Sequence, residues 1–275
     1  MWQKFTEDFY FNFIEKDRWL YLVDGLKITL TVTLLAVILG IVIGLIVGVI
    51  RSTYEKTHKL KILNFICNLY LTVIRGTPVV VQLMIIYYVI FGSLRVDKVP
   101  VAVLAFGINS GAYVAEIFRS GIMSIDNGQF EAGRSLGFNY PQTMWYIIMP
   151  QAFKNILPAL CNEFISLLKE TSVAGFIALQ DLTKGGDIIR SITYSATMPL
   201  LAVAAIYLII VIIFTQLIKC LERRLRQSER EYMGSTSDPG EKSSKKLWSQ
   251  YRSGRCDSRY IQRGCGMCYR GVRLR

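Results

Sequence analysis

The apolar residues of this chain are gathered into long uninterrupted runs, a pattern typical of helices that cross a membrane. About 20 mostly apolar residues in helical form span the hydrocarbon core of a bilayer. Runs of this kind, without a charged residue, cover residues 28–50, 76–94 and 197–218. Two weaker runs lie between the second and the third of them. The pattern predicts an all-α membrane protein with five transmembrane helices, over about residues 26–50, 66–92, 99–118, 156–179 and 197–219.

Lysine and arginine residues near the ends of the predicted spans indicate the orientation of the chain. Twelve lie in the connections around residues 51–61 and 119–154 and in the flank after the last span, and eight lie on the other side. Because loops rich in lysine and arginine stay in the cytoplasm, the N-terminus is expected outside and the C-terminus inside. Residues 1–25 are then an extracytoplasmic N-terminal segment, and residues 26–230 are a transmembrane domain.

The formal net charge of +12 raises the question of a nucleic-acid partner, but its distribution does not favour one. A net charge of +7 belongs to residues 235–275, and much of the remainder flanks the spans and anchors them. The sequence has no basic face interleaved with aromatic residues, so nucleic-acid binding is not expected. Cys265 and Cys268 form a single Cys-x-x-Cys, whereas a zinc site needs about four ligands. No metal site is expected either.

The third connection, about residues 120–154, is longer than a link between adjacent helices needs to be. Residues 129–136 are predicted to form a short helix that ends at Gly137, because glycine readily adopts the left-handed conformation. Asn139 is predicted to cap a second helix, with Gln142 completing a capping box. The pattern predicts a cytoplasmic helix–turn–helix. By itself it fits a docking element and a structural lid equally well.

Three glycines recur every four residues in the first predicted span, at Gly40, Gly44 and Gly48. Small residues at this spacing lie on one face of a helix and allow a neighbouring helix to approach closely. The pattern predicts a close helix–helix contact along the first span, and no further role is expected of these glycines.

Two stretches of the sequence carry motifs that resemble a known family. Residues 111–176 contain a Glu-Ala-Ala pattern with a later Gly and Ile-x-Leu-Pro, present here as Glu131-Ala132-Gly133, Gly137 and Ile148-Met149-Pro150. Gly133 replaces the second alanine, and Met149 replaces leucine. Residues 75–83, Arg-Gly-Thr-Pro-Val-Val-Val-Gln-Leu, are similar to the second-helix signature of the same family. Over about residues 20–230 the chain resembles the polar-amino-acid branch of the binding-protein-dependent ABC importer permeases.

The resemblance implies an ABC type I importer permease fold and a multi-pass subunit that moves polar amino acids across the bacterial inner membrane. It implies three kinds of protein partner: ABC ATPase subunits, an extracytoplasmic amino-acid-binding protein, and a second permease copy or a sister permease. The sequence has no Gly-Lys-Ser/Thr phosphate loop. The chain is therefore not expected to be an enzyme or to hold a cofactor. ATP and Mg are expected to bind to the partner ATPase. Within the 120–154 connection, the ATPase-coupling residues implied are Glu131, Ala132, Gly133 and Gly137.

Polar side chains recur at helical spacing on two predicted spans. Asn109, Tyr113 and Glu116 form such a stripe on the third span, spaced i, i+4, i+7. Glu163, Ser166 and Glu170 form another on the fourth span, spaced i, i+3, i+7. Polar and ionisable groups inside a membrane usually face the bundle interior or water. Carboxylates on these faces fit the ammonium of an amino acid, and hydroxyl and amide groups fit its carboxylate. The alternative is that these groups only hydrogen-bond between helices or subunits. The expected pathway residues are Thr77, Asn109, Tyr113, Glu116, Glu163, Ser166, Glu170 and Thr171.

Residues 231–275 lie beyond the family pattern and are expected to form a separate basic tail. Read one base later with synonymous codons, residues 246–275 resemble the start of an ABC ATPase up to its glycine-rich phosphate loop. Trp248 and Met267 have single codons, and they fix Gly and Cys in the shifted frame. The expectation is a frameshifted, disordered tail. The alternative is a genuine disordered basic tail that lies on anionic membrane lipid.

Two other functions are compatible with the sequence. One is an importer of another small solute, such as an opine or a compatible solute. The other is a membrane scaffold that holds a cytoplasmic partner through the 120–154 hairpin. A scaffold has no need of acids in the middle of two spans, so the pathway residues favour a transporter. Glu163 and Glu170 together favour a cationic amino acid such as arginine, lysine or histidine.

Overall fold

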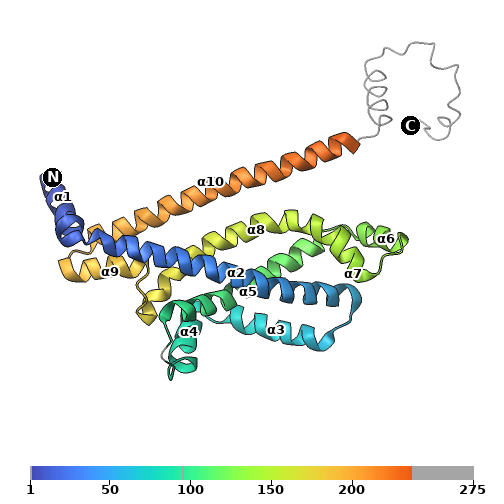
Figure 1. Cartoon of the computed structure of the whole chain (residues 1–275), viewed down its shortest axis with the longest axis horizontal. Coiled ribbons are helices and arrows are strands. Elements are labelled where there is room, and N and C mark those ends of the chain that lie inside the picture. The colour runs from blue at the N-terminus through green and yellow to red at the C-terminus, as the bar shows by residue number, and fades with distance from the viewer. Residues whose placement is uncertain (1, 95, 237–275) are drawn as a thin grey trace, which may run out of the picture. The chain divides into compact units, whose positions relative to one another are not determined.

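The computed structural model describes residues 2–94 and 96–236, and no strand occurs in that part of the chain. Residues 1–222 form one compact unit, within which all contacts given below lie. Of the tail over residues 231–275, expected to be disordered or frameshifted, residues 231–236 form the end of the last helix, so disorder is wrong for them, and residues 237–275 lie outside the described residues. The elements are α1 Trp2–Phe9, η1 Tyr10–Ile14, η2 Glu15–Asp17, α2 Trp19–Thr57, α3 Lys61–Gly76, α4 Val79–Met84, η3 Ile85–Ile90, α5 Lys98–Met123, α6 Asn127–Ser135, α7 Tyr140–Thr143, η4 Met144–Ile148, α8 Met149–Glu170, η5 Thr171–Ile177, α9 Leu182–Thr193 and α10 Thr197–Thr236 (Figure 1).

Helix α2 packs along α5, and the predicted glycine face of α2 forms this contact. A Cβ atom on Gly44 would lie 2.4 Å from Cγ1 of Val114, and one on Gly48 would lie 2.6 Å from Cβ of Phe118. A Cβ on Gly40 would lie 3.0 Å from the hydroxyl of Ser110. The predicted close helix–helix contact is confirmed. The two backbones are nearer than any larger side chain at these positions allows.

The predicted span 66–92 is wrong as a single helix. It consists of α3, which ends at Gly76, and the segment Val79–Ile90, and the two are bent by 105°. Pro78 explains the break, because proline drives the preceding residue into extended conformation, and Thr77 has φ −122° and ψ 145°. The buried side chain of Gln82 donates to the carbonyls of Ile74 and Thr77 at 2.7 and 3.0 Å. It thereby satisfies carbonyls that the break leaves without helical partners.

The fourth predicted helix, 156–179, is displaced in the structure. Helix α8 follows directly on the π-helical segment η4, begins at Met149 and ends at Glu170, after which the chain turns into the 3-10 segment η5. Pro158 lies inside α8, where a proline ordinarily breaks or kinks a helix. Proline is tolerated in membrane helices where neighbouring groups satisfy the freed carbonyl. Helix α9, which lies in a predicted connection, was not foreseen.

Three helices of the described residues are long and apolar enough to cross a membrane: Trp19–Thr57, Lys98–Met123 and Thr197–Arg223. The bent pair Lys61–Gly76 and Val79–Ile90 is a fourth if it counts as one span. Helix α8 is not among them, since Lys154, Glu163, Lys169 and Glu170 lower its hydropathy. The all-α class with several apolar spans is confirmed, and the count of five stays a prediction.

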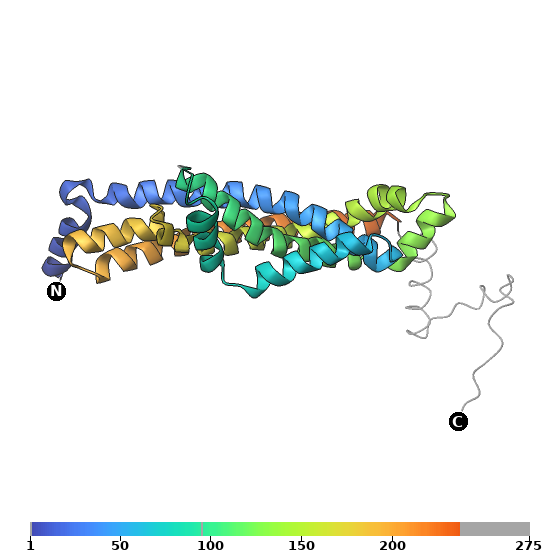
Figure 2. The same ribbon diagram turned by 90° about the horizontal axis from the view of Figure 1, so that it is seen from below.

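The two ends of α2 contact different parts of the chain. Near its beginning, a Cβ on Gly25 would lie 2.5 Å from the carbonyl oxygen of Asp181, and the hydroxyl of Thr29 accepts from the backbone N–H of Leu182 at 3.1 Å. Near its end, Lys56 lies over the ring of Phe130 in α6, 4.9 Å from its centroid. The N-terminal segment and α9 therefore lie at one end of the bundle and α6 at the other (Figure 2).

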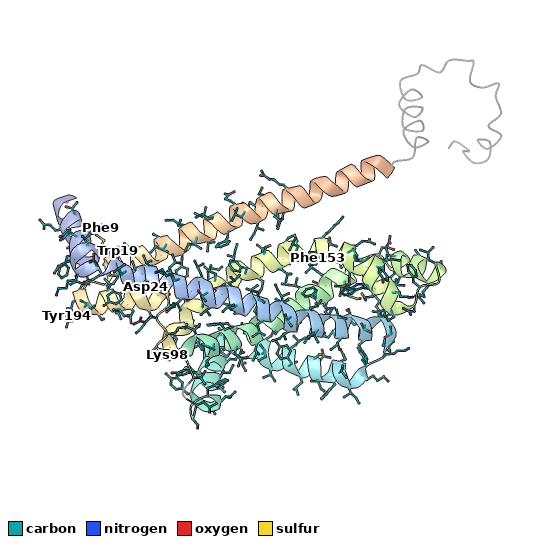
Figure 3. The ribbon with its side chains drawn as sticks, viewed as in Figure 1. Phe9, Trp19, Asp24, Lys98, Phe153 and Tyr194 are labelled. Atoms are coloured by element: carbon teal, nitrogen blue, oxygen red, sulfur yellow. The ribbon has the colours of Figure 1, made fainter. Side chains whose placement is uncertain are left out.

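Helix α9 is held at its start by Asp181, whose carboxylate accepts from the backbone N–H groups of Thr183 and Lys184, both at 3.1 Å. Burial raises the pKa of Asp181, and these hydrogen bonds oppose that rise. Farther along α9, hydrogen bonds from Lys184 and Arg190 lower the pKa of Asp187. Exposed aromatic side chains, among them Trp19 and Tyr194, gather at this same end of the molecule (Figure 3). Tryptophan and tyrosine favour the boundary between membrane and water.

Candidate functional site

Four of the polar side chains inside the bundle join α5 to α8. The amide of Asn109 donates to Oε2 of Glu170 at 3.3 Å, and the hydroxyl of Ser110 donates to Oε1 of Glu163 at 2.9 Å. Asn109 and Ser110 are buried, and both carboxylates are half-buried. These four residues are called the α5–α8 seam below. The structure thus brings together one residue of the third-span stripe and two of the fourth-span stripe.

The carboxylates of the seam have neutral partners only. In the part of the chain that the structure describes, no lysine or arginine comes within 4.0 Å of Glu163 or Glu170 as an ion pair. A carboxylate in a membrane domain is costly unless a cation or several donors compensate it. In the described residues the seam therefore presents two carboxylates that are hydrogen-bonded to neutral groups and lack an ion pair.

The other expected pathway residues lie elsewhere. Thr77 is exposed at the α3–α4 break, where its hydroxyl accepts from Gln82 at 2.8 Å. Thr171 is buried, and its hydroxyl donates to the carbonyl of Leu168 at 2.8 Å, so it serves the start of η5. Ser166 is half-buried on α8. Tyr113 and Glu116 face away from the seam, toward α3.

A cavity of about 620 Å³ opens between α2, α3 and α5, and it is called the α3 cavity below. Two of the expected pathway residues line it, together with arginines of α2 and α3 that the sequence analysis did not assign to a site. The overlooked signal is Arg75, the first residue of the second-helix motif. The lining residues are Arg51, Asn68, Leu71, Thr72, Arg75, Gly76, Tyr113 and Glu116.

Glu116 belongs to an ionic cluster that ties α2 to α5. Its Oε2 lies 2.9 Å from Nη1 of Arg51, and its Oε1 is hydrogen-bonded to Arg119. Arg119 also pairs with Glu55 of α2 at 3.2 Å. Two arginines therefore balance Glu116. In this structure its contacts are those of an interhelical ion pair, the alternative that was open for the pathway residues.

The connection between α5 and α8 contains two short helical stretches separated by a turn. Gly137 has φ +81°, and the N–H groups of Gly137 and Phe138 donate to carbonyls of α6 at 2.9 and 3.1 Å. Asn139 and Gln142 form the reciprocal capping box, with both bonds at 3.0 Å. The predicted stop at Gly137 and the predicted capping box are confirmed. Helix α6 begins two residues earlier than expected because Asp126 caps it.

Gly133 is explained by the packing of this hairpin. A Cβ atom at Gly133 would lie 2.5 Å from Cγ2 and 2.7 Å from Oγ1 of Thr143, on the opposite arm. The departure from the family's second alanine therefore matches the close approach of the Thr143 side chain. Glu131 and Ala132 are exposed on the outer side.

Gly133→Ala is expected to destabilise the protein by about 1–3 kcal/mol, the usual range for overpacking. Thr143→Ala in the same chain is expected to restore most of the loss, because it removes both atoms nearest the new methyl group. The Thr143 hydroxyl has no hydrogen-bond partner in the described structure, so its removal breaks no bond. Thermal unfolding of the two single variants and the double variant measures the coupling. Strict additivity of the two changes would contradict the contact.

Large apolar side chains are exposed around the same hairpin. The exposed fractions are 70% for Leu136, 67% for Trp145 and 68% for Tyr146, and Glu131 lies exposed on α6 beside them. Exposed aromatic and aliphatic side chains gathered with a charged group mark a surface for another protein.

Comparison with known proteins identifies the class. Residues 28–227 match the family of binding-protein-dependent transport system inner membrane components, and the chain belongs to that family. It is therefore a multi-pass membrane component of an ABC transport system, whose ATP-hydrolysing subunit is a separate chain. A binding protein and an ATPase are its partners in general terms.

Particular relatives fall among amino-acid transporters. The chain is 41% identical to the arginine transport system permease protein ArtQ of Bacillus subtilis (strain 168) over 167 residues, which are 60% of this chain and 76% of that protein. It is 40% identical to the glutamine transport system permease protein GlnP of Escherichia coli (strain K12) over 168 residues, 60% of this chain and 77% of the relative.

Solved structures agree with the fold. The crystal structure of an amino acid ABC transporter with histidines superposes with a TM-score of 0.69 at 41% identity, over 77% of this chain and 98% of that chain. The MetNI methionine ABC transporter in an inward-facing conformation superposes with a TM-score of 0.66 at 22% identity, over 74% of this chain and 95% of the other, which supports the fold alone. The architecture is that of an ABC type I importer permease.

Proposed function

We propose that this chain is the permease subunit of an ABC importer that moves polar amino acids across the bacterial inner membrane. The observation that carries the proposal is the 41% identity to an amino acid ABC transporter chain that is covered over 98% of its length. Import of an opine or a compatible solute is the alternative, but the relatives described above are named for amino acids.

The α5–α8 seam supplies the contact for the ammonium of the substrate. Glu163 and Glu170 accept hydrogen bonds only from the neutral groups of Ser110 and Asn109, so a cation can exchange with those donors without breaking an ion pair. Hydrogen bonds to charged groups contribute about 1.5–3 kcal/mol. Two carboxylates on one seam favour arginine, lysine or histidine over acidic amino acids.

The hairpin formed by α6, α7 and η4 supplies the contact with the ATPase. Gly137 and the Asn139–Gln142 capping box fix its shape, and a fixed shape transmits a displacement that a loose loop would absorb. Leu136, Trp145 and Tyr146 offer apolar surface, and Glu131 offers a carboxylate to cations of the partner. The ATPase binds ATP and Mg, and this chain carries the movement into the membrane.

The remaining partners follow from the predicted orientation. With the hairpin in the cytoplasm, the end that holds α9 and the N-terminal segment faces outward and receives a loaded amino-acid-binding protein. The exposed face of α3 and α5, with its charged α3 cavity, is unsuited to lipid. A second permease copy or a sister permease covers this face.

Purification from the native membrane tests the proposal. An ATPase subunit is expected to co-purify, and its ATP hydrolysis is expected to rise severalfold when a binding protein loaded with an amino acid is added. Binding protein loaded with an opine or a compatible solute is the control. Stimulation by that control alone would assign a different solute, and an associated protein without ATPase activity would favour the scaffold function.

Glu163→Gln and Glu170→Gln are each expected to lower arginine uptake about tenfold at saturating loaded binding protein, with uptake of glutamine less affected. Each change removes a charge from the seam at nearly constant volume, and its hydrogen bond survives. Lys61→Gln, which removes an exposed charge on α3 away from the seam, is the control and is expected to transport normally. Uptake is measured in proteoliposomes with co-purification of the ATPase as the assembly check. Unchanged kinetics for every amino acid in both variants would make the seam structural.

A further inference from the structure

Arg75 lies where a membrane protein rarely places a cation. It is the last residue but one of α3, about 20 Å along the helix from Lys61 at 1.5 Å per residue. Its guanidinium stands over the ring of Tyr113, which is in the middle of α5, at 5.6 Å from the ring centroid. Its side chain is exposed in this chain, and an ionisable residue at this position along a membrane span usually faces a water-filled cavity or a partner, which makes it a candidate functional group.

Within the described residues no carboxylate forms an ion pair with Arg75, and Glu116, on the same cavity, attracts it only at longer range. Among the ion pairs of the described residues, Arg51 and Arg119 pair with Glu116, and Arg119 also pairs with Glu55. Arg75 takes part in none of them, and in the described part of the chain its guanidinium stands over the ring of Tyr113. The α3 cavity contains two arginines and one glutamate, so its formal charge is +1. It is suited to one anionic group.

Two further donors lie on the same face of α3. Asn68, Thr72 and Arg75 are spaced i, i+4, i+7, so they follow one another along the helix surface that lines the cavity. An amide, a hydroxyl and a guanidinium are together the donors that a carboxylate accepts, and arginine binds carboxylates through two parallel bonds. The cavity volume of about 620 Å³ exceeds that of a free amino acid.

The helix break beside Arg75 leaves room for a ligand. A Cβ atom at Gly76 would meet nothing within 4 Å, so the backbone is open there. The neighbouring carbonyls of Ile74 and Thr77 accept from Gln82, which reduces their repulsion of an approaching anion. The helix break therefore combines free space at Gly76, the guanidinium of Arg75 and backbone carbonyls that are already hydrogen-bonded.

We propose that Arg75, with Asn68 and Thr72, binds the α-carboxylate of the amino acid during its passage through the permease. The inference rests on the proposed function and adds to it the group that recognises the anionic end of the substrate. Because the α-ammonium and the α-carboxylate share one carbon, the seam and the α3 cavity, on two sides of α5, hold one substrate in turn and not together. Selection against amines that lack a carboxylate follows from Arg75.

Ligand binding to the purified permease–ATPase complex in lipid nanodiscs, without binding protein, tests this role. The probes are L-arginine and L-argininamide, which differ in the carboxylate. Arg75→Gln is expected to weaken binding of L-arginine about tenfold to a hundredfold, as the loss of a charged hydrogen-bonded pair does. It is expected to leave binding of L-argininamide within about twofold of the unaltered complex.

Two more variants complete the test. Arg75→Lys keeps the charge but not the two parallel bonds, so an intermediate loss for L-arginine alone is expected, and it replaces Arg75→Gln if that variant does not assemble. Lys61→Gln, an exposed charge at the other end of α3, is expected to change neither affinity. Equal losses for both probes, or no loss, would overturn the role of Arg75. If the unaltered complex binds no L-arginine while loaded binding protein still stimulates its ATPase, this inference fails and the proposed function stands.

Discussion

Glu131→Lys is expected to reduce amino-acid uptake at least tenfold while the protein stays folded. Glu131 lies exposed on α6, within a hairpin whose own shape depends on Gly133, Gly137 and the Asn139–Gln142 box rather than on this carboxylate. Reversing its charge therefore leaves the packing unchanged and places a cation against cations of the ATPase. Like charges opposed across an interface weaken binding by several kcal/mol.

Uptake and ATP hydrolysis in the same proteoliposomes separate coupling from folding. The expected result is a loss of uptake, with ATPase that either dissociates or hydrolyses ATP without response to loaded binding protein. Glu131→Gln is the matched control, because it removes the charge at nearly constant volume without opposing like charges, and a smaller loss of uptake is expected. Normal uptake by Glu131→Lys would remove Glu131 from the coupling contact.

Gly44→Leu is expected to abolish the folded permease. The Cβ atom alone would lie 2.4 Å from Cγ1 of Val114 and 2.8 Å from the backbone nitrogen of Ala115. A side chain can rotate away, but the backbone of α5 moves only if the whole helix moves. Since α2 and α5 form the most extensive helix pair of the bundle, their separation exposes the buried polar groups between them. A free-energy loss above about 3 kcal/mol, beyond ordinary overpacking, is expected.

Gel filtration of the detergent-solubilised protein, with thermal unfolding of whatever remains, measures this effect. Gly44→Ala is expected to unfold at a lower temperature than the unaltered chain. Gly175→Ala is the matched control, because the atoms nearest its Cβ would lie at 3.7 Å or more, which is ordinary van der Waals contact. Equal stability of Gly44→Ala and Gly175→Ala would show that α2 and α5 are not in close contact.

Local features of the fold are predictable from this sequence because a few neighbouring residues determine them. The Gly40–Gly44–Gly48 face, the stop at Gly137 and the Asn139 capping box each depend on backbone geometry within one or two turns. The 105° bend at Pro78 is different. Proline signals a break, but the direction of the chain afterwards depends on Gln82 reaching back to α3, a tertiary contact.

The candidate site is only partly predictable for a related reason. Helical spacing places Asn109, Tyr113 and Glu116 on one broad face of α5, but it does not indicate which neighbouring helix covers each part of that face. The structure divides them: Asn109 contacts α8, while Tyr113 and Glu116 face α3. Arg75 was visible in a motif, yet that no carboxylate of the described residues forms an ion pair with it is evident only once the surrounding helices are placed.

The central claim is that this permease carries amino acids into the cell at the expense of ATP hydrolysed by a partner. The most direct measurement is uptake of radiolabelled L-arginine and L-glutamine into proteoliposomes that contain the permease and its co-purified ATPase. Loaded binding protein is added outside, and ATP and Mg are enclosed. The account predicts accumulation of at least one of the two amino acids against its gradient, abolished when ATP or binding protein is omitted. Accumulation that proceeds without ATP, or none for any amino acid while another solute accumulates, would contradict it.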